Sequence, residues 1–240
     1  AWQLLSTPIT ASSTQTLKQA WQEGATIANG NPVLGYGTQL TSNIAGAATQ
    51  STPGFDVFTS TPSIKVYNAA TASYKRMDST TGRISNPKGY MVLVRGGRSV
   101  ITSGGSPTAT TMRTKGTLHT PANTPANMNV AAGFESIGNP YASAIDFRSL
   151  TITGGVQTDF FYLWDPKLTS IGLNSAYGLG GFQTFSWNGS SFDVTPGGGS
   201  YAGSNRFIES GQAFFVHAPF TGGTVGFSES AKVNGSFSVN

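Results

Sequence analysis

Two histidines and ten acidic residues are the side chains that could support acid–base or metal chemistry in this chain of 240 residues. His119 and His217 have no acidic neighbour at a useful spacing, and the sequence contains neither a G-x-S-x-G nucleophile motif nor an H-E-x-x-H zinc motif. It also contains no cysteine, which excludes a disulfide framework and a thiolate metal site. The sequence therefore predicts no catalytic residue, no metal site and no cofactor, and it favours a non-enzymatic protein.

Three aspartates leave a secreted hydrolase open as an alternative. Glycosidases use two carboxylates that flank the bond to be broken, and Asp146, Asp159 and Asp165 could converge on folding. Residues 197–202 formally fit the dinucleotide-binding pattern G-x-G-x-x-A, but no βαβ unit surrounds them, so we interpret the segment as a loop.

Aromatic side chains suggest a second alternative, a carbohydrate-binding module of a polysaccharide-degrading enzyme. A sugar ring can stack on the flat apolar face of an exposed aromatic side chain. Tryptophans within strands are better explained by core packing, whereas Tyr36 and Tyr177 lie in glycine-rich segments and are better candidates. The residues that we single out as glycan contacts are Tyr36, Tyr177, Trp21 and Tyr201.

The charges are few and unevenly distributed. Residues 1–120 hold ten Lys or Arg and three acidic residues, whereas residues 121–240 hold four and seven. The basic side chains are not clustered enough to predict nucleic-acid binding. A basic face could instead meet an acidic face of a second copy and propagate as a filament. The predicted assembly faces are Lys75, Arg76, Arg95, Arg98, Arg113 and Lys115 on the basic side, and Asp159, Asp165, Asp193, Glu209 and Glu229 on the acidic side.

The elements that must position these residues are mainly strands. Short runs rich in β-branched and aromatic residues alternate with Gly, Pro, Asn and Ser clusters, a pattern typical of an all-β protein. One short helix is predicted at 14–23, capped by Ser13 or Thr14. No apolar run is long enough to predict a membrane span. The predicted strands are 63–67, 90–95, 98–102, 160–164, 182–187, 213–218 and 224–228.

The sequence repeats itself weakly. The segment from Trp2 to Pro8 returns from Phe134 to Pro140, residues 66–68 return as 163–165, and residues 89–96 return as 211–218. We therefore predict two related β-sandwich-like units in tandem, a basic unit at 1–128 and an acidic unit at 129–240.

Residues 133–147, GFESIGNPYASAIDF, resemble a run of large secreted surface proteins of the Bacteroidetes, W/F-x-L-I/L-G-N-P-Y-x-S-x-I-D-W/F. Those proteins leave the cell by the type IX secretion system. Four further segments are similar to segments of the same proteins: Trp2 to Pro8, Tyr162 to Asp165, Ile208 to Val216 and Phe227 to Lys232. The resemblance implies an extracellular protein at the bacterial cell surface, and we expect the chain to be the part in front of a C-terminal sorting domain.

Two smaller features bear on the same resemblance. Asn139-Pro140-Tyr141 is a turn signal, for which a structural role suffices. Residues 78–80 are similar to the short O-glycosylation acceptor used in these bacteria, which makes Ser79 a candidate acceptor.

Together these patterns favour a non-enzymatic extracellular protein that acts in adhesion or as a structural part of a surface layer or filament. Its expected partners are a second copy of itself or surface glycans.

Overall fold

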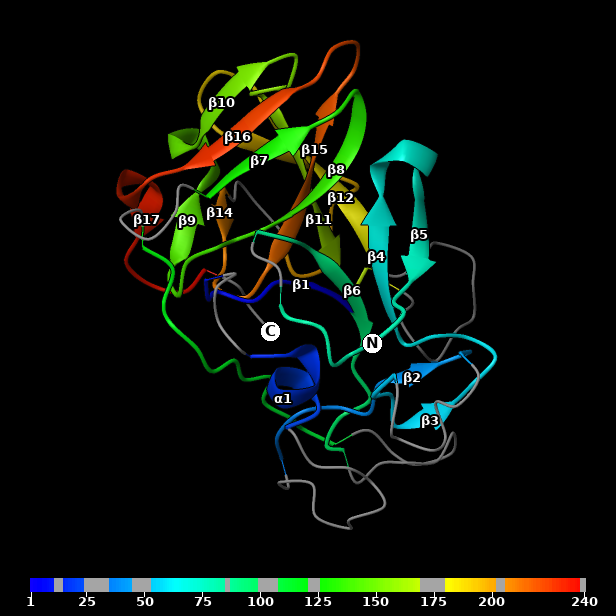
Figure 1. Cartoon of the computed structure of the whole chain (residues 1–240). Coiled ribbons are helices and arrows are strands. Elements are labelled where there is room, and N and C mark those ends of the chain that lie inside the picture. The colour runs from blue at the N-terminus through cyan, green and yellow to red at the C-terminus, as the bar shows by residue number, and fades with distance from the viewer. Residues whose placement is uncertain are drawn as a thin grey trace.

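The computed structural model describes residues 1–10, 15–23, 35–44, 53–84, 87–98, 108–120, 126–168, 180–201 and 206–237. It has mainly antiparallel strands and one short α-helix, α1 (Leu17–Trp21), so the prediction of an all-β, sandwich-like fold is confirmed (Figure 1). The predicted strand at 98–102 lies almost entirely outside the described residues.

A four-stranded sheet belongs to the N-terminal half. Its order is β1-β6-β4-β5, with bounds Trp2–Leu5, Tyr90–Leu93, Ile64–Asn68 and Ser73–Arg76. Alternate side chains of these strands, including Ile64 and Val92, join Trp21 of α1 in the first core. The short parallel pair β2 (Thr41–Ser42) and β3 (Val57–Phe58) lies at the same end of the molecule as α1 (Figure 1).

Helix α1 is shorter than predicted because its cap lies further along the chain. The Thr16 hydroxyl accepts a hydrogen bond from the Gln19 amide, and the Gln19 side chain accepts one from the Thr16 amide. This capping box begins the helix at Leu17. Ser13 and Thr14 lie outside the described residues.

The C-terminal half contains a five-stranded sheet of order β13-β12-β11-β15-β8. Two three-stranded sheets, β10-β16-β7 and β14-β9-β17, enclose the second core with it. A 3-10 helix follows three of the strands, at η2 (Ala69–Thr71), η3 (Phe147–Ser149) and η4 (Glu229–Ala231). The strands are β7 (Ala126–Val130), β8 (Gly133–Gly138), β9 (Ala144–Asp146), β10 (Thr151–Gly154), β11 (Phe160–Asp165), β12 (Gly181–Trp187), β13 (Phe192–Thr195), β14 (Phe207–Ile208), β15 (Ala213–Ala218), β16 (Gly223–Phe227) and β17 (Lys232–Val233).

The outer faces of the two large sheets pack against each other. Leu4 and Met91 of the first sheet contact Ala213 and Phe215 of the second, and we call this group the interface cluster. Strand β11 shows the consequence, because Phe161 is buried in the second core while Tyr162, on the opposite face, packs on the interface cluster. A sheet with apolar neighbours on both faces needs large side chains at successive positions.

The two large sheets share one strand order, with β1, β6, β4 and β5 corresponding to β8, β15, β11 and β12. Two backbone bridges also join the N-terminal half to the C-terminal half. Leu5 forms an antiparallel bridge with Gln212, and Ile137 forms one with Lys88. If Leu5 corresponds to Ile137, as the predicted repeat has it, these two bridges are equivalent.

Strand pairing changes two details of the predicted repeat. It matches Lys88 with Gln212, whereas the sequence alignment matched Gly89 with Gly211, so that alignment is wrong by two residues. The boundary predicted at residue 128 falls inside β7, which pairs with β16, so the second group of strands begins by Ala126.

Candidate functional site

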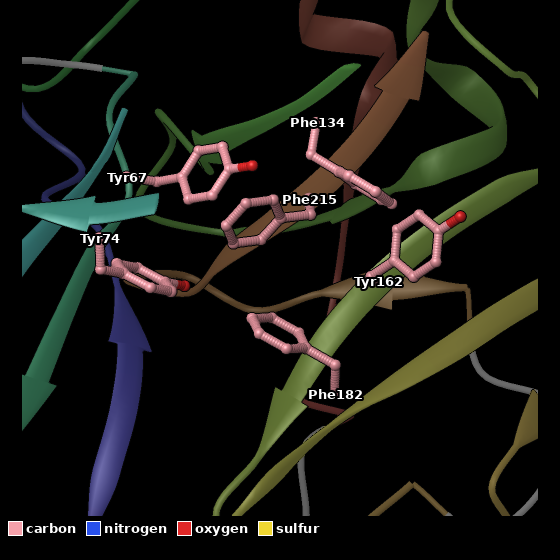
Figure 2. A pocket seen from close by; sticks show the side chains of 6 residues that line it. All are labelled: Tyr67, Tyr74, Phe134, Tyr162, Phe182 and Phe215. Carbon is pink, nitrogen blue, oxygen red and sulfur yellow. The ribbon is translucent and has the colours of Figure 1, made fainter. Parts of the chain in front are cut away.

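An aromatic cleft opens where the two large sheets diverge beside the interface cluster. Its volume is about 240 Å³. The first sheet supplies Tyr67 and Tyr74, and the second sheet closes the cleft from the other side (Figure 2). The six side chains that line this aromatic cleft are Tyr67, Tyr74, Phe134, Tyr162, Phe182 and Phe215.

Strand pairing fixes the positions of the six rings. Tyr67 of β4 lies directly opposite Tyr74 of β5, and their ring centroids are 5.5 Å apart. Phe215 of β15 lies between the two sheets, 4.8 Å from Tyr67 and 5.2 Å from Phe182. Every one of these ring pairs meets edge to face, the preferred geometry for aromatic side chains.

Two phenylalanines form the part of the wall most open to solvent. Phe134 and Phe182 are 38% and 37% exposed, although both are large apolar side chains. Phe134 packs at 5.3 Å against Tyr162, and Phe182 packs at 5.1 Å against Trp164. A ligand in the cleft would bury the exposed ring surface, which is favourable in proportion to the apolar area removed from water.

The ionisable groups of the lining are three tyrosine phenols, which stay protonated at neutral pH. Burial raises the pKa of Tyr67, Tyr74 and Tyr162, and the neighbouring Glu135 raises that of Tyr67 further. The Tyr74 hydroxyl is buried without a hydrogen-bond partner. Burial also raises the pKa of Glu135 itself. The lining of the cleft is therefore uncharged and apolar, and it contains three neutral phenols.

We expect alkaline titration to reveal these phenols. Because the folded pKa of each exceeds its unfolded value of about 10, the stability they contribute is present below pH 10 and is lost as the pH rises further. Phenolate absorbance of the native protein should show a group of tyrosines that ionise late. Replacing Tyr74 by Phe should remove one of them, and a native protein whose phenols all ionise near pH 10 would contradict the buried positions.

Two of the predicted glycan contacts are wrong. Trp21 is only 2% exposed because it packs in the first core against Tyr90. Tyr201 is buried in the second core, where burial raises its pKa to about 12 and its hydroxyl accepts a hydrogen bond from Gln212. Tyr36 is partly exposed, but the Arg113 guanidinium lies 3.5 Å from its ring centroid. Tyr177 lies outside the described residues.

Two of the predicted assembly residues are also wrong, because they are buried. Arg98 is 1% exposed and forms an ion pair with Asp56 inside the first half. Asp165 is fully buried and accepts hydrogen bonds from Lys167 and Ser200. The others stay predictions: Lys75, Arg76, Arg113, Lys115, Asp159, Asp193 and Glu229 are exposed, and Arg95 and Glu209 are partly buried.

The aspartates considered for a hydrolase are each held by a different partner. Asp146 forms an ion pair with Arg206, and Asp159 forms one with Arg148. Within the described ranges, no three His, Asp or Glu side chains lie close enough together to hold a metal ion. His217 stacks on Phe134 at 4.3 Å and is 3.0 Å from the Gln157 amide oxygen.

Asn139 has the structural role expected of the Asn-Pro-Tyr turn. Its side-chain amide donates to the carbonyls of Ser143, Ile208 and Glu209, and its oxygen accepts from the Tyr141 amide. The candidate acceptor Ser79 is less suited to modification, since its hydroxyl donates to the Pro53 carbonyl and contacts Thr81.

Sequence reasoning missed the aromatic cleft, although one signal pointed to it. Strand β11 has aromatic residues on both faces, with Phe161 on one and Phe160, Tyr162 and Trp164 on the other. Such a strand requires a second apolar layer, and large rings at the margin of that layer are candidates for a binding surface.

This arrangement defines an all-β protein whose two largest sheets pack together with an aromatic cleft between them. A family model described as "Domain of unknown function (DUF8693)" matches residues 39–238, so the chain belongs to that family. No curated protein and no solved structure matches the chain. None of the helices in the described ranges has the length and apolarity needed to cross a membrane.

Proposed function

We propose that the protein is a non-enzymatic extracellular module that acts in adhesion at the bacterial cell surface. In this proposal the aromatic cleft holds an apolar group presented by the surface to which the protein attaches. The observation that carries the proposal is the lining of the cleft, which consists of six aromatic side chains contributed by both sheets.

The chemistry of the lining favours binding over reaction. A catalytic site needs a group whose pKa allows it to exchange a proton near neutral pH. The lining offers phenylalanine rings and the phenols of Tyr67, Tyr74 and Tyr162, whose raised pKa keeps them neutral. These side chains supply apolar contact.

The shape of the cleft favours an apolar side chain over a sugar. The rings of Tyr67 and Phe215 meet at 82°, and those of Phe134 and Tyr162 meet at 73°, so the walls stand at angles to one another instead of forming a flat platform. An apolar cavity of about 150 Å³ already binds benzene. A cleft of about 240 Å³ therefore has room for one aromatic or branched aliphatic side chain.

The place of action rests on the resemblance to secreted surface proteins of the Bacteroidetes. Phe134, which lines the cleft, stands at the start of the run that carries this resemblance, and Asn139 stands in its middle. The run thus builds a strand of the cleft and the turn that anchors that strand.

Attachment of the purified chain to surfaces of defined chemistry tests the proposal. We expect binding to a phenyl-terminated monolayer to exceed binding to a hydroxyl-terminated or a cellobiose-bearing monolayer. Replacing Phe134 and Phe182 together by Ser should weaken binding to the phenyl surface by about tenfold or more, since each buried ring is worth about 1.5–3 kcal/mol. Biolayer interferometry measures all three surfaces.

The matched control replaces two exposed phenylalanines outside the cleft, Phe58 and Phe220, by Ser. It removes the same chemistry from the surface and should leave binding unchanged. Urea unfolding checks that both double variants are folded. An equal loss of binding to the phenyl surface in the two variants would show non-specific adsorption and contradict the proposal. Stronger binding to cellobiose would favour the carbohydrate-binding alternative.

A further inference from the structure

Strand β5 is the outer strand of the four-stranded sheet. It pairs with β4 on one side, and no strand in the described ranges pairs with its other side. Tyr74, one of the four residues of β5, lines the aromatic cleft. Among the residues that the structure describes, an edge without a strand partner therefore lies next to an apolar cleft.

The second sheet shows what fills the equivalent edge. The cross-strand pair of Tyr67 and Tyr74 corresponds to the pair of Trp164 and Phe182 in β11 and β12. In the second sheet the next position is occupied by β13, which pairs with β12 from Thr184 to Trp187. The first sheet has the same strand order without a strand at that position among the described residues.

We propose that β5 accepts an extended strand from a partner protein, which places a large apolar side chain in the aromatic cleft and an acidic side chain beside Arg76. The inference rests on the proposed function, because it uses the same cleft. Added strands of this kind gain affinity from main-chain hydrogen bonds and specificity from pockets for alternate side chains.

The spacing of β5 defines the partner sequence. Tyr74 and Arg76 are two residues apart, so they project from the same face of the strand. In an added strand, the residues opposite them are also two apart on one face, where aromatic pairs and opposite charges are favourable. The partner motif is therefore a large apolar residue and an acidic residue separated by one residue, in either chain direction.

The charges at this edge favour an acidic partner. Lys75 and Arg76 are exposed, and Lys65 lies opposite Arg76 with its ammonium over the Trp2 ring. The Arg76 guanidinium also donates to Asn43 and lies 3.9 Å from Asp78. Both contacts are exposed, and surface ion pairs of that kind are weak. Positive charge on an edge also discourages pairing with a like edge, which leaves an oppositely charged strand as the favoured partner.

A symmetric peptide tests the proposal in both chain directions, acetyl-Thr-Asp-Thr-Phe-Thr-Asp-Thr-amide. We expect calorimetric titration into the full chain to show saturable binding. Peptides with Ala for Phe, with Lys for both Asp, or with every backbone amide N-methylated should each bind about tenfold more weakly or not at all, since they remove the anchor, the charge or the main-chain donors.

Arg76→Glu should reverse the preference between the Asp and Lys peptides, while Lys115→Glu, another exposed cation of the same half, should leave it unchanged. Binding that ignores Arg76→Glu or N-methylation would overturn the strand proposal. If the peptide does not bind while Phe134 and Phe182 remain necessary for the phenyl surface, the strand proposal falls and the proposed function stands. If the chain alone self-associates and Arg76→Glu abolishes this, the edge of β5 binds a second copy. That result would overturn the proposal of a different partner protein.

Discussion

Replacing Phe214 by Ala should lower the free energy of unfolding by about 3–5 kcal/mol, the usual cost of removing a fully buried aromatic side chain. Phe214 lies on β15, between β11 and β8, and its ring packs edge to face at 6.1 Å from Phe147. The second core surrounds it completely, so the cavity left by alanine cannot be filled by water without further cost. Urea unfolding followed by fluorescence measures the loss.

Phe220 supplies the matched control, because it is 89% exposed and only six residues further along the chain. Phe220→Ala should change the free energy of unfolding by less than about 0.5 kcal/mol, as is usual for surface positions. A loss below about 1 kcal/mol for Phe214→Ala would mean that the ring is not enclosed, and would contradict the second core as described.

Asp56→Ala should cost about 3–5 kcal/mol, since removing one partner of a buried ion pair leaves an uncompensated charge. The Asp56 carboxylate accepts hydrogen bonds from the Arg98 guanidinium and, at 3.0 Å, from the Leu40 amide. Arg98 also donates to the Gln22 carbonyl, so it ties three segments of the first half together. Without the carboxylate, a guanidinium that is 1% exposed has no counter-charge.

Asp78→Ala is the control for this prediction. The Asp78 side chain is 93% exposed and lies 3.9 Å from Arg76, so its removal should cost about 0–1 kcal/mol. The variant Asp56→Ala, Arg98→Met, which removes both charges, should be more stable than Asp56→Ala alone. If both single aspartate variants lose the same small amount, the buried ion pair is absent from the protein in solution.

The strands could be predicted from the sequence because short runs of apolar and β-branched residues, bounded by turn residues, mark them. In β15, Phe214 and Val216 alternate with residues of the opposite face, and both are fully buried. The Asn139 turn could be predicted for a similar reason, since its side chain contacts Ser143 and Tyr141 within the same short segment. Patterns of this kind depend on neighbours in the chain.

The burial of charges could not be predicted, because it depends on distant partners. Arg98 meets Asp56 across 42 residues of sequence, and Asp165 meets Ser200 across 35. By residue type alone, a charged side chain is expected at the surface. The sequence-based assignment of Arg98 and Asp165 to assembly faces therefore failed where tertiary structure supplied a counter-charge or a set of backbone donors.

The aromatic cleft required the packing of two sheets, which no local pattern defines. Tyr67 and Phe215 come within 4.8 Å of each other from opposite halves of the chain. The search for exposed aromatic residues outside strands selected Trp21 and Tyr201, which are core residues, and passed over rings on strand faces. Aromatic residues at successive strand positions, as in β11, are the more informative signal.

The binding role of the aromatic cleft is tested most directly by isotope-filtered nuclear Overhauser measurements. The phenylalanine ring of the symmetric peptide would carry ¹³C, and the chain would be added at natural abundance. We expect contacts between that ring and the rings of Tyr74, Tyr162 and Phe182, which surround the cleft. Contacts to Phe220 or Leu118 instead, both exposed outside the cleft, would contradict the assignment of this site.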